Sequence, residues 1–226
     1  MINELFKPGT IGCDLKSAIL GLMNGIKFNM EFPLFTQLSN ITTIYKRRGS
    51  RLDMNNDRGI FILSSARKIL DKLVYNDKYP HLDKGMSDSN IGSRKNKNIK
   101  NHLFTVYGII HSILKEGKSC IDIGIYDIEK AFDGLWLEDC MNDMYDTLPQ
   151  DQRDDKLSLI YESNKNNLVA VNTPVGLTKR VNIPKIVTQG GTFGPIKCSN
   201  SIDKIDKKCH DTGIQKNGKS VTFIAL

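Results

Sequence analysis

The chain has 226 residues, of which 39% are hydrophobic and 25% are charged. These proportions are typical of a globular protein and exclude a disordered chain or a membrane protein. The formal net charge of +7 permits a polyanionic partner without requiring one. Because no apolar run approaches the roughly 20 residues that cross a bilayer, and the N-terminus lacks a secretory signal, we expect an intracellular protein without a membrane partner.

The five cysteines are odd in number and widely spaced along the sequence. No two have the short spacing of a zinc-binding motif, so the sequence predicts free thiols in a reducing compartment. Cys198, Cys209 and His210 suggest a metal site, but a structural role is the better interpretation of so few ligands.

Apolar spacing in the first half of the chain predicts helices that alternate with short strands. Asp14 is a suitable N-cap for the first helix, and Ser64 or Ser65 is suitable for the second. The predicted elements are a helix at 14–28, a strand at 38–45, an apolar segment at 60–63 and a helix that reaches residue 74.

The second half begins with residues 84–101, which are rich in Gly, Ser, Asn and basic residues and predict an exposed basic loop. A β-branched run at 120–126 predicts a buried strand. The other predicted elements are a helix at 103–113, a helix through residue 141, a hairpin at 168–183, a helix at 196–209 and a strand at 221–226. This order is typical of an α+β fold with an antiparallel sheet.

The first candidate site is Asp127, which follows the predicted strand and opens the segment Asp-Ile-Glu-Lys-Ala-Phe-Asp. A carboxylate at a strand end is held without a flexible tether, which suits a magnesium ligand. Two other interpretations remain open. Asp127 is also a preferred N-cap for the helix that follows, and Asp122, on the opposite side of the strand, is a rival carboxylate.

A glycine-rich segment, Thr188 to Pro195, precedes the helix at 196–209. Its glycines allow the backbone to approach a flat ligand closely, and the amide of Gln189 can hydrogen-bond the edge of a base or a sugar. The alternative is an ordinary glycine-rich loop with Pro195 in the first helical turn.

Basic residues occupy the predicted turn between the first two apolar segments that could form strands. Ammonium and guanidinium groups around a turn form a good cradle for a triphosphate, although exposed basic turns are also common without any function. The residues are Lys46, Arg47, Arg48 and Arg51, followed by Arg58.

The order of these three segments resembles the fingers and palm of reverse transcriptases, in particular those of non-LTR, LINE-like retroelements. The shared features are the basic hairpin, an Asp-x-x-x-Ala-Phe-Asp motif from Asp127 and a Gln-Gly-x-x-x-Gly-Pro motif from Gln189. The segment that begins at Arg58 is similar to the finger signature of these enzymes, and residues 89–95 are similar to their next conserved loop. The resemblance covers about residues 38–226.

The resemblance implies an α+β fold with right-hand polymerase fingers and a partial palm, in which helices flank an antiparallel sheet and the thumb is absent. Residues 1–37 would form a helical lead-in, residues 38–115 the fingers and residues 116–226 the partial palm. The implied activity is template-directed DNA synthesis by two-metal nucleotidyl transfer, with Mg²⁺ as the cofactor. The implied partners are an RNA template, a DNA primer and deoxynucleoside triphosphates.

Roles in catalysis and nucleotide binding follow for the matching residues. Asp127 would be a carboxylate ligand shared by two magnesium ions, and Phe132 would be a steric gate that excludes a ribose 2′-hydroxyl. Gln189 and Gly190 would line the nascent base pair and the template.

Basic residues would hold the phosphates of the substrate and the template. The triphosphate would be bound by Arg58 together with one residue of a set that the sequence does not resolve: Lys46, Arg47 or Arg48. The template backbone would be contacted without sequence preference by Arg94, Lys95, Lys97 and Lys100.

Two departures from the family pattern change these expectations. Gly194 stands where the family more often has Ser, which would loosen the loop. Val221 to Leu226 match the leading strand of the family's Asp-Asp hairpin and the sequence ends there, so we expect an incomplete metal site and no polymerase turnover. The alternative function is a non-catalytic, nucleic-acid-binding remnant of a retroelement that uses only the basic fingers.

Overall fold

The computed structural model of the protein describes residues 13–117, 123, 125, 127–128, 131–183, 187–188 and 190–212. The helices are α1 (Cys13–Asn29), α2 (Leu34–Gln37), α3 (Ser65–Gly85), α4 (Ile99–Lys115), α5 (Ala131–Gly134), α6 (Leu137–Thr147), α7 (Lys156–Lys165) and α8 (Gly194–Thr212). The strands are β1 (Leu38–Tyr45), β2 (Asp57–Leu63), β3 (Leu168–Thr173), β4 (Gly176–Leu177) and β5 (Val181–Asn182). Single 3₁₀ turns lie at Met54–Asn56 and Gln150–Gln152.

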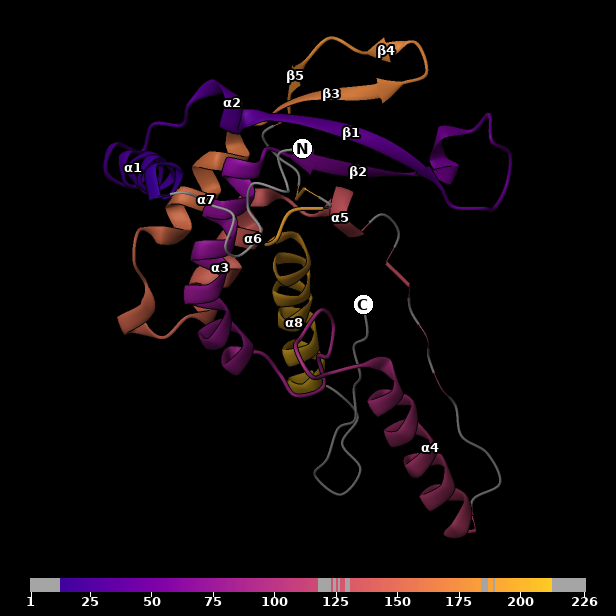
Figure 1. The fold of residues 1–226 in the computed structure, drawn as a ribbon. Coiled ribbons are helices and arrows are strands. Elements are labelled where there is room, and N and C mark those ends of the chain that lie inside the picture. Colours follow the sequence, from indigo (N-terminus) through magenta and orange to yellow (C-terminus); the bar gives the residue numbers. More distant parts are fainter. Residues whose placement is uncertain are drawn as a thin grey trace.

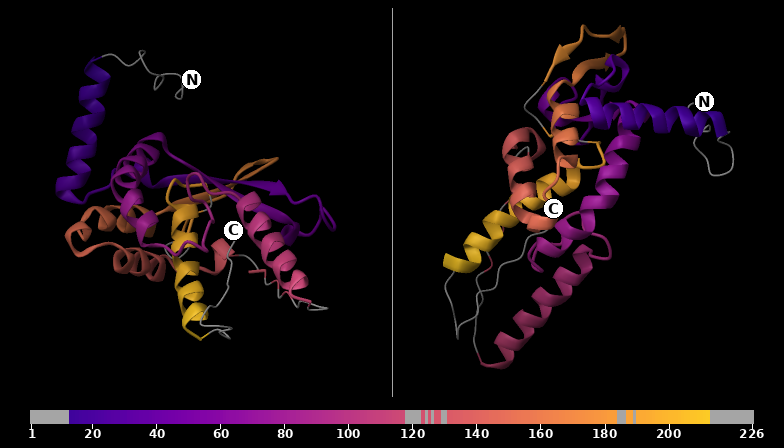
Figure 2. Two further views of the ribbon diagram at one scale, coloured as in Figure 1. Left: turned by 90° about the horizontal axis from the view of Figure 1, so that it is seen from below. Right: turned by 90° about the vertical axis from the view of Figure 1, so that its left-hand side faces the viewer.

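The described strands form an open, five-stranded sheet, and the helices gather beneath one of its faces (Figure 1). The strand order is β2-β1-β3-β4, and β5 also pairs with β3. Figure 2 shows from two further directions that α4 projects away from the other helices. The α+β class predicted from the sequence is therefore confirmed.

The strands β1 and β2 form a long antiparallel hairpin, from Ser39 opposite Leu63 to Tyr45 opposite Asp57. The predicted strand at 38–45 is confirmed, and the apolar segment at 60–63 is the second half of β2. Phe61 and Leu63 are buried on one face of β2 whereas Ile62 between them is exposed, because successive side chains of a strand point to opposite faces. The hairpin therefore presents one buried face and one partly exposed face.

The pairing of β3 with β1 is parallel, with Leu38 opposite Leu168. The prediction of an antiparallel sheet is therefore wrong at this position. A parallel pair needs a long crossover connection, and here that connection contains β2 and helices α3 to α7. The predicted hairpin at 168–183 is confirmed, since β4 and β5 both pair antiparallel with β3.

The main hydrophobic core lies among α3, α6, α7 and α8. Its most deeply buried side chains, each at most 1% exposed, are Leu82, Leu137, Met144, Leu148, Ile160 and Ile196. Helix α3 begins as predicted, because the Ser64 hydroxyl accepts a hydrogen bond from the Arg67 amide at 3.3 Å. It carries the predicted apolar residues up to Val74 and continues past Pro80, since its buried face continues to Leu82.

The predicted buried strand at 120–126 is not found in the two of its residues that the structure describes. Ile123 is 56% exposed and Ile125 is 89% exposed, and neither pairs with a strand in the described part of the chain. The rest of this segment, and the strand predicted at 221–226, lie outside the described residues. The helix predicted through residue 141 is instead two helices, α5 and α6.

Two further predictions concern the thiols and membrane insertion. Cys140 and Cys198 are buried and free, as predicted, and burial raises the pKa of the Cys198 thiol to about 11. Among the helices that the structure describes, none combines the length and the apolar character that a membrane span requires.

The loop between α3 and α4 corrects the prediction of an exposed basic segment. Arg94 is 8% exposed, and its guanidinium points into the protein. Its Nε donates to Asp83 Oδ1 at 2.8 Å, and Nη2 donates to the Asp83 carbonyl at 2.8 Å. Its Nη1 donates to the carbonyls of Ser87 at 2.6 Å and Asn90 at 2.7 Å. The guanidinium therefore stabilises the loop from within, and the prediction that residues 84–101 are exposed is wrong at Arg94.

We predict that Arg94→Ala lowers the free energy of unfolding by about 2–3 kcal/mol, because it leaves buried carbonyls and the Asp83 carboxylate without their donor. Urea denaturation followed by circular dichroism measures this change. Lys100→Ala removes an exposed basic side chain from the same region and serves as the control, with an expected change below about 0.5 kcal/mol. Equal effects of the two substitutions would contradict the assigned role of Arg94.

Candidate functional site

The glycine-rich loop lies against the backbone of β2. Gly190 has a φ of +115°, and a Cβ at this position would lie 2.5 Å from the Phe61 carbonyl oxygen and 3.4 Å from Ile60 Cγ2. A Cβ on Gly191 would lie 3.3 Å from Leu63 Cδ1. Only glycine satisfies both the positive φ and the close approach at position 190. The backbone of Gly190 and Gly191, which has no side chains, therefore lies against β2, the edge strand of the sheet.

Gly194 closes this loop tightly. A Cβ at position 194 would lie 2.7 Å from the Thr188 carbonyl oxygen, and the Gly194 amide donates to the Gly191 carbonyl at 3.2 Å. The expectation that glycine in place of serine loosens the loop is therefore wrong, because a larger residue would force the loop open. Pro195 follows in the first turn of α8, as predicted for a helix start.

The half-buried Phe132 belongs to the same site. Its Cε1 atom would lie 3.8 Å from a Cβ on Gly194, so the ring flanks the start of α8. Helix α5, which carries Phe132, lies beneath β2 in Figure 1. Two of the predicted nucleotide-binding positions, Phe132 and Gly190, are thus brought to the two ends of one short loop.

Asp127 is exposed to solvent, so its carboxylate is accessible to a cation. Gln189 lies outside the described residues. No group of three or more His, Cys, Asp or Glu side chains in the described ranges lies close enough together to hold a metal. Of the carboxylates in the segment that begins at Asp127, the structure places Asp127 at the surface.

The basic turn forms the tip of the β1–β2 hairpin, at the end farthest from α3 (Figure 1). The Lys46 ammonium donates to the Asn55 carbonyl at 2.8 Å, and the Arg51 guanidinium lies 5.2 Å from the centre of the Tyr45 ring. Arg47 and Arg48 are exposed and make no ion pair with a described residue. Of the three residues that the sequence did not separate, these two arginines are the more available to a phosphate.

Arg58 lies on β2, opposite Ile44 of β1, and is exposed. Ile60, which Gly190 approaches, is two residues farther along the strand, or about 7 Å. Arg58 therefore lies between the basic tip and the glycine-rich loop, and the strand holds these three features in a fixed order.

Two lysines of the α3–α4 loop, and Lys100 in the first turn of α4, lie at the surface. Lys95 and Lys100 are exposed, and Lys97 is half-buried. The Lys95 ammonium lies 5.1 Å from the centre of the Tyr79 ring, and Lys97 Nζ lies 3.2 Å from an oxygen of the Asp88 carboxylate. We call Lys95, Lys97 and Lys100 the lysine array. They are the predicted template contacts other than Arg94, whose guanidinium is buried.

A buried charge cluster, which sequence reasoning missed, connects α3 with α8 one turn below the glycine-rich loop. Arg67 is 2% exposed, Asp71 is 3% exposed and Lys197 is 2% exposed. No nitrogen of the Arg67 guanidinium has a hydrogen-bond partner in the part of the chain that the structure describes. The three groups therefore interact through charge rather than through direct hydrogen bonds. The spacing of Arg67 and Asp71, four residues apart in a helix, was the one signal available in the sequence.

Burial controls the protonation of this cluster. It raises the pKa of Asp71, against the lowering effect of Arg67 and Lys197. It lowers the pKa of Lys197 from 10.5 to about 8, although the Asp71 carboxylate opposes that shift. Lys197 is thus close to losing its proton at mildly alkaline pH.

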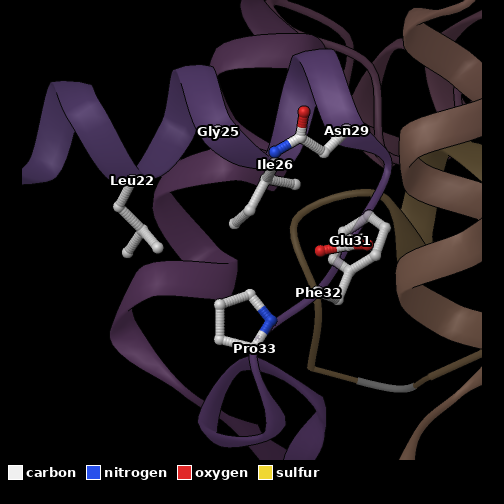
Figure 3. A pocket seen from close by; sticks show the side chains of 7 residues that line it. All are labelled: Leu22, Gly25, Ile26, Asn29, Glu31, Phe32 and Pro33. Atoms are coloured by element: carbon white, nitrogen blue, oxygen red, sulfur yellow. The ribbon is translucent and has the colours of Figure 1, made fainter.

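Two pockets lie away from these residues. One, of about 310 Å³, lies where α1 ends (Figure 3). Leu22 and Ile26 point from α1 toward Pro33, and Phe32 lies beside them. The other, of about 510 Å³, lies at the start of α3 and includes Arg180 on its rim. Neither pocket is lined by a residue that the sequence predicted to be functional.

Comparison with known proteins adds no family assignment, since neither the protein-family models nor the curated proteins include a match to this chain. The functional interpretation therefore depends on the arrangement of the glycine-rich loop, Phe132, Arg58 and the basic groups described above.

We predict that Gly190→Ala lowers the free energy of unfolding by about 2–4 kcal/mol, from backbone strain and from contact with the Phe61 carbonyl. Gly176→Ala is the matched control, because Gly176 has a φ of +125° but no atom within 4 Å of the added Cβ. We expect strain alone there, or about 1–2 kcal/mol. Chemical denaturation of both variants measures the difference, and equal losses would show that the loop does not lie on β2.

We also predict that the unfolding free energy of the wild type rises relative to that of Lys197→Met between pH 8 and pH 10. In this range the unfolded lysine holds a proton that the folded one has lost, because its pKa falls from 10.5 to about 8 on folding. The cost of burying the charge is thus fully present below pH 8 and is relieved above it. The expected gain is on the order of 2 kcal/mol at pH 10. A constant difference between the two proteins in urea denaturation would refute this assignment.

Proposed function

We propose that this chain binds a nucleic-acid duplex and an incoming nucleotide in the manner of a reverse transcriptase, as part of a DNA polymerase related to those of LINE-like retroelements. The observation that carries the proposal is the position of the glycine-rich loop. It lies on the strand that bears Arg58, and its far end meets Phe132. Three segments that the resemblance assigns to one nucleotide site thus include β2 and the loop that lies against it.

Each part of this surface suits one part of the ligand. Bare backbone at Gly190 and Gly191 allows a flat base pair to approach closely. The exposed guanidinium of Arg58, with Arg47 or Arg48 at the hairpin tip, suits the phosphates of a nucleotide. The Phe132 ring would stand where a bulky group excludes a 2′-hydroxyl. The lysine array suits a phosphate backbone, which is recognised by charge without sequence preference.

Catalysis itself is a further part of the proposal. Asp127 would be one carboxylate ligand of the two magnesium ions that such polymerases use, and its exposure to solvent is compatible with that role. Other carboxylates are needed to complete the site. Nucleotide binding is therefore a sharper test of this chain than DNA synthesis.

The first experiment measures ternary-complex formation. An RNA template with a labelled DNA primer that lacks a 3′-hydroxyl is bound to the full chain in the presence of Mg²⁺, and dissociation is followed by fluorescence anisotropy. The complementary deoxynucleotide should slow dissociation at least several-fold, and a mismatched one should not. Arg58→Gln should abolish this effect, whereas Lys16→Gln, which removes an exposed charge on α1, should preserve it.

The second arm tests nucleotide selection. The wild type should respond to a complementary deoxynucleotide but not to the matching ribonucleotide, and Phe132→Val should respond to both because the smaller side chain leaves room for the 2′-hydroxyl. If the duplex binds but no nucleotide slows its release, the chain is a nucleic-acid-binding protein without polymerase function. If no duplex binds, both interpretations fail.

A further inference from the structure

The loop that carries Lys95 and Lys97, and that leads into α4 with Lys100, is fastened to α8 by hydrogen bonds between Asn90 and Ser199. Asn90 Nδ2 donates to the Ser199 carbonyl at 2.8 Å. The single proton of the Ser199 hydroxyl is shared between two acceptors in the loop, the Gly92 carbonyl at 2.7 Å and Asn90 Oδ1 at 3.0 Å. Both side chains are buried, with Asn90 and Ser199 each 0% exposed. We call this pair the clasp.

The clasp specifies one arrangement of the loop. The Asn90 amide also accepts a hydrogen bond from the Gly92 amide at 3.1 Å and donates to Asp203 Oδ1 at 3.3 Å. A buried amide whose donors and acceptor are all satisfied excludes alternative registers, because each would leave a polar group without a partner. On the other side of the loop, the Lys95 amide donates to the Tyr79 hydroxyl at 2.7 Å. The loop is therefore held between α3 and α8.

The clasp also lies at a fixed distance along α8 from the glycine-rich loop. Ser199 is five residues after Gly194, the start of α8, and a helix rises about 1.5 Å per residue, so the clasp lies about 7.5 Å along the axis from the glycine-rich loop. Helix α8 thus begins at the candidate nucleotide site and, farther along, contacts the loop that bears Lys95 and Lys97. Figure 1 shows this loop beside α8.

We propose that Asn90 and Ser199 are positioning residues that hold the lysine array at a fixed place relative to the glycine-rich loop, so that a bound duplex meets both. This inference rests on the proposed function for its ligand but not for its geometry. Neither residue touches the nucleic acid. Their effect is to present Lys95, Lys97 and Lys100 already ordered, which reduces the conformational entropy that binding would otherwise cost.

The first test of the clasp needs no ligand. In Ser199→Ala, backbone amides of residues 90–97 should exchange with deuterium at least ten-fold faster than in the wild type, while those of α6 and α7 keep their rates. Ser163→Ala is the matched control, because Ser163 is 1% exposed and its hydroxyl donates one hydrogen bond, to Ile160, on α7. Unchanged exchange in the loop of Ser199→Ala would overturn the clasp.

The second test measures how binding of the RNA–DNA duplex depends on salt. Replacing all three lysines of the array by Gln should reduce the slope of log affinity against log salt by about 2–3. Ser199→Ala should reduce the slope by a similar amount, and adding it to the triple variant should cause no further loss. Ser163→Ala should leave the slope unchanged.

The outcomes separate the two proposals. The positioning role is supported if Ser199→Ala speeds amide exchange in the loop and lowers the salt slope of duplex binding, without lowering it further in the triple lysine variant. The positioning role is overturned if amide exchange becomes faster while the salt slope stays unchanged. It is also overturned if the effects of Ser199→Ala and of the lysine substitutions on the salt slope add. If the wild type binds no duplex, the proposed function fails and the positioning role fails with it, while the exchange data still decide whether the clasp exists.

Discussion

The close approach of Gly190 to the Phe61 carbonyl is the constraint on which the arrangement of this protein depends. Because glycine has no side chain, the glycine-rich loop can lie directly on the backbone of β2. The loop then closes at Gly194, and this closure fixes where α8 begins. From that starting point α8 packs against α6 and contacts the loop before α4 through Ser199 and Asp203.

Helix α8 is unusual in burying polar groups on several sides. Lys197 faces the charges of α3, Ser199 faces Asn90, and the Asp203 carboxylate accepts from the Ser87 amide at 2.9 Å. Such groups add little net stability, since each loses water on burial, but mispairing them is costly. They therefore contribute specificity, and they hold the helix in one rotation and one register against its neighbours.

Much of the fold could be predicted from the sequence, because apolar periodicity and capping residues are local signals. The strand at 38–45 and the Ser64 cap are examples. Helix α7 has a weak apolar stripe that includes buried Ser163, so its periodicity did not reveal it. The parallel pairing of β1 and the burial of Arg94 depend on partners distant in sequence or on tertiary enclosure, which composition does not encode. For the site, glycine positions were informative, whereas the clasp and the charge cluster had no local signature strong enough to find them.

The parallel pairing of β1 with β3 has a consequence for synthesis of the chain. Strand β1 emerges early from the ribosome and can pair soon afterwards with β2, since only residues 46–56 separate the two strands. The other edge of β1 can pair with β3 only after α3 to α7 and β3 itself have been translated. During that interval an open strand edge faces other nascent chains, with which it can aggregate. The pace of elongation across this middle segment therefore determines how long the half-made sheet is vulnerable.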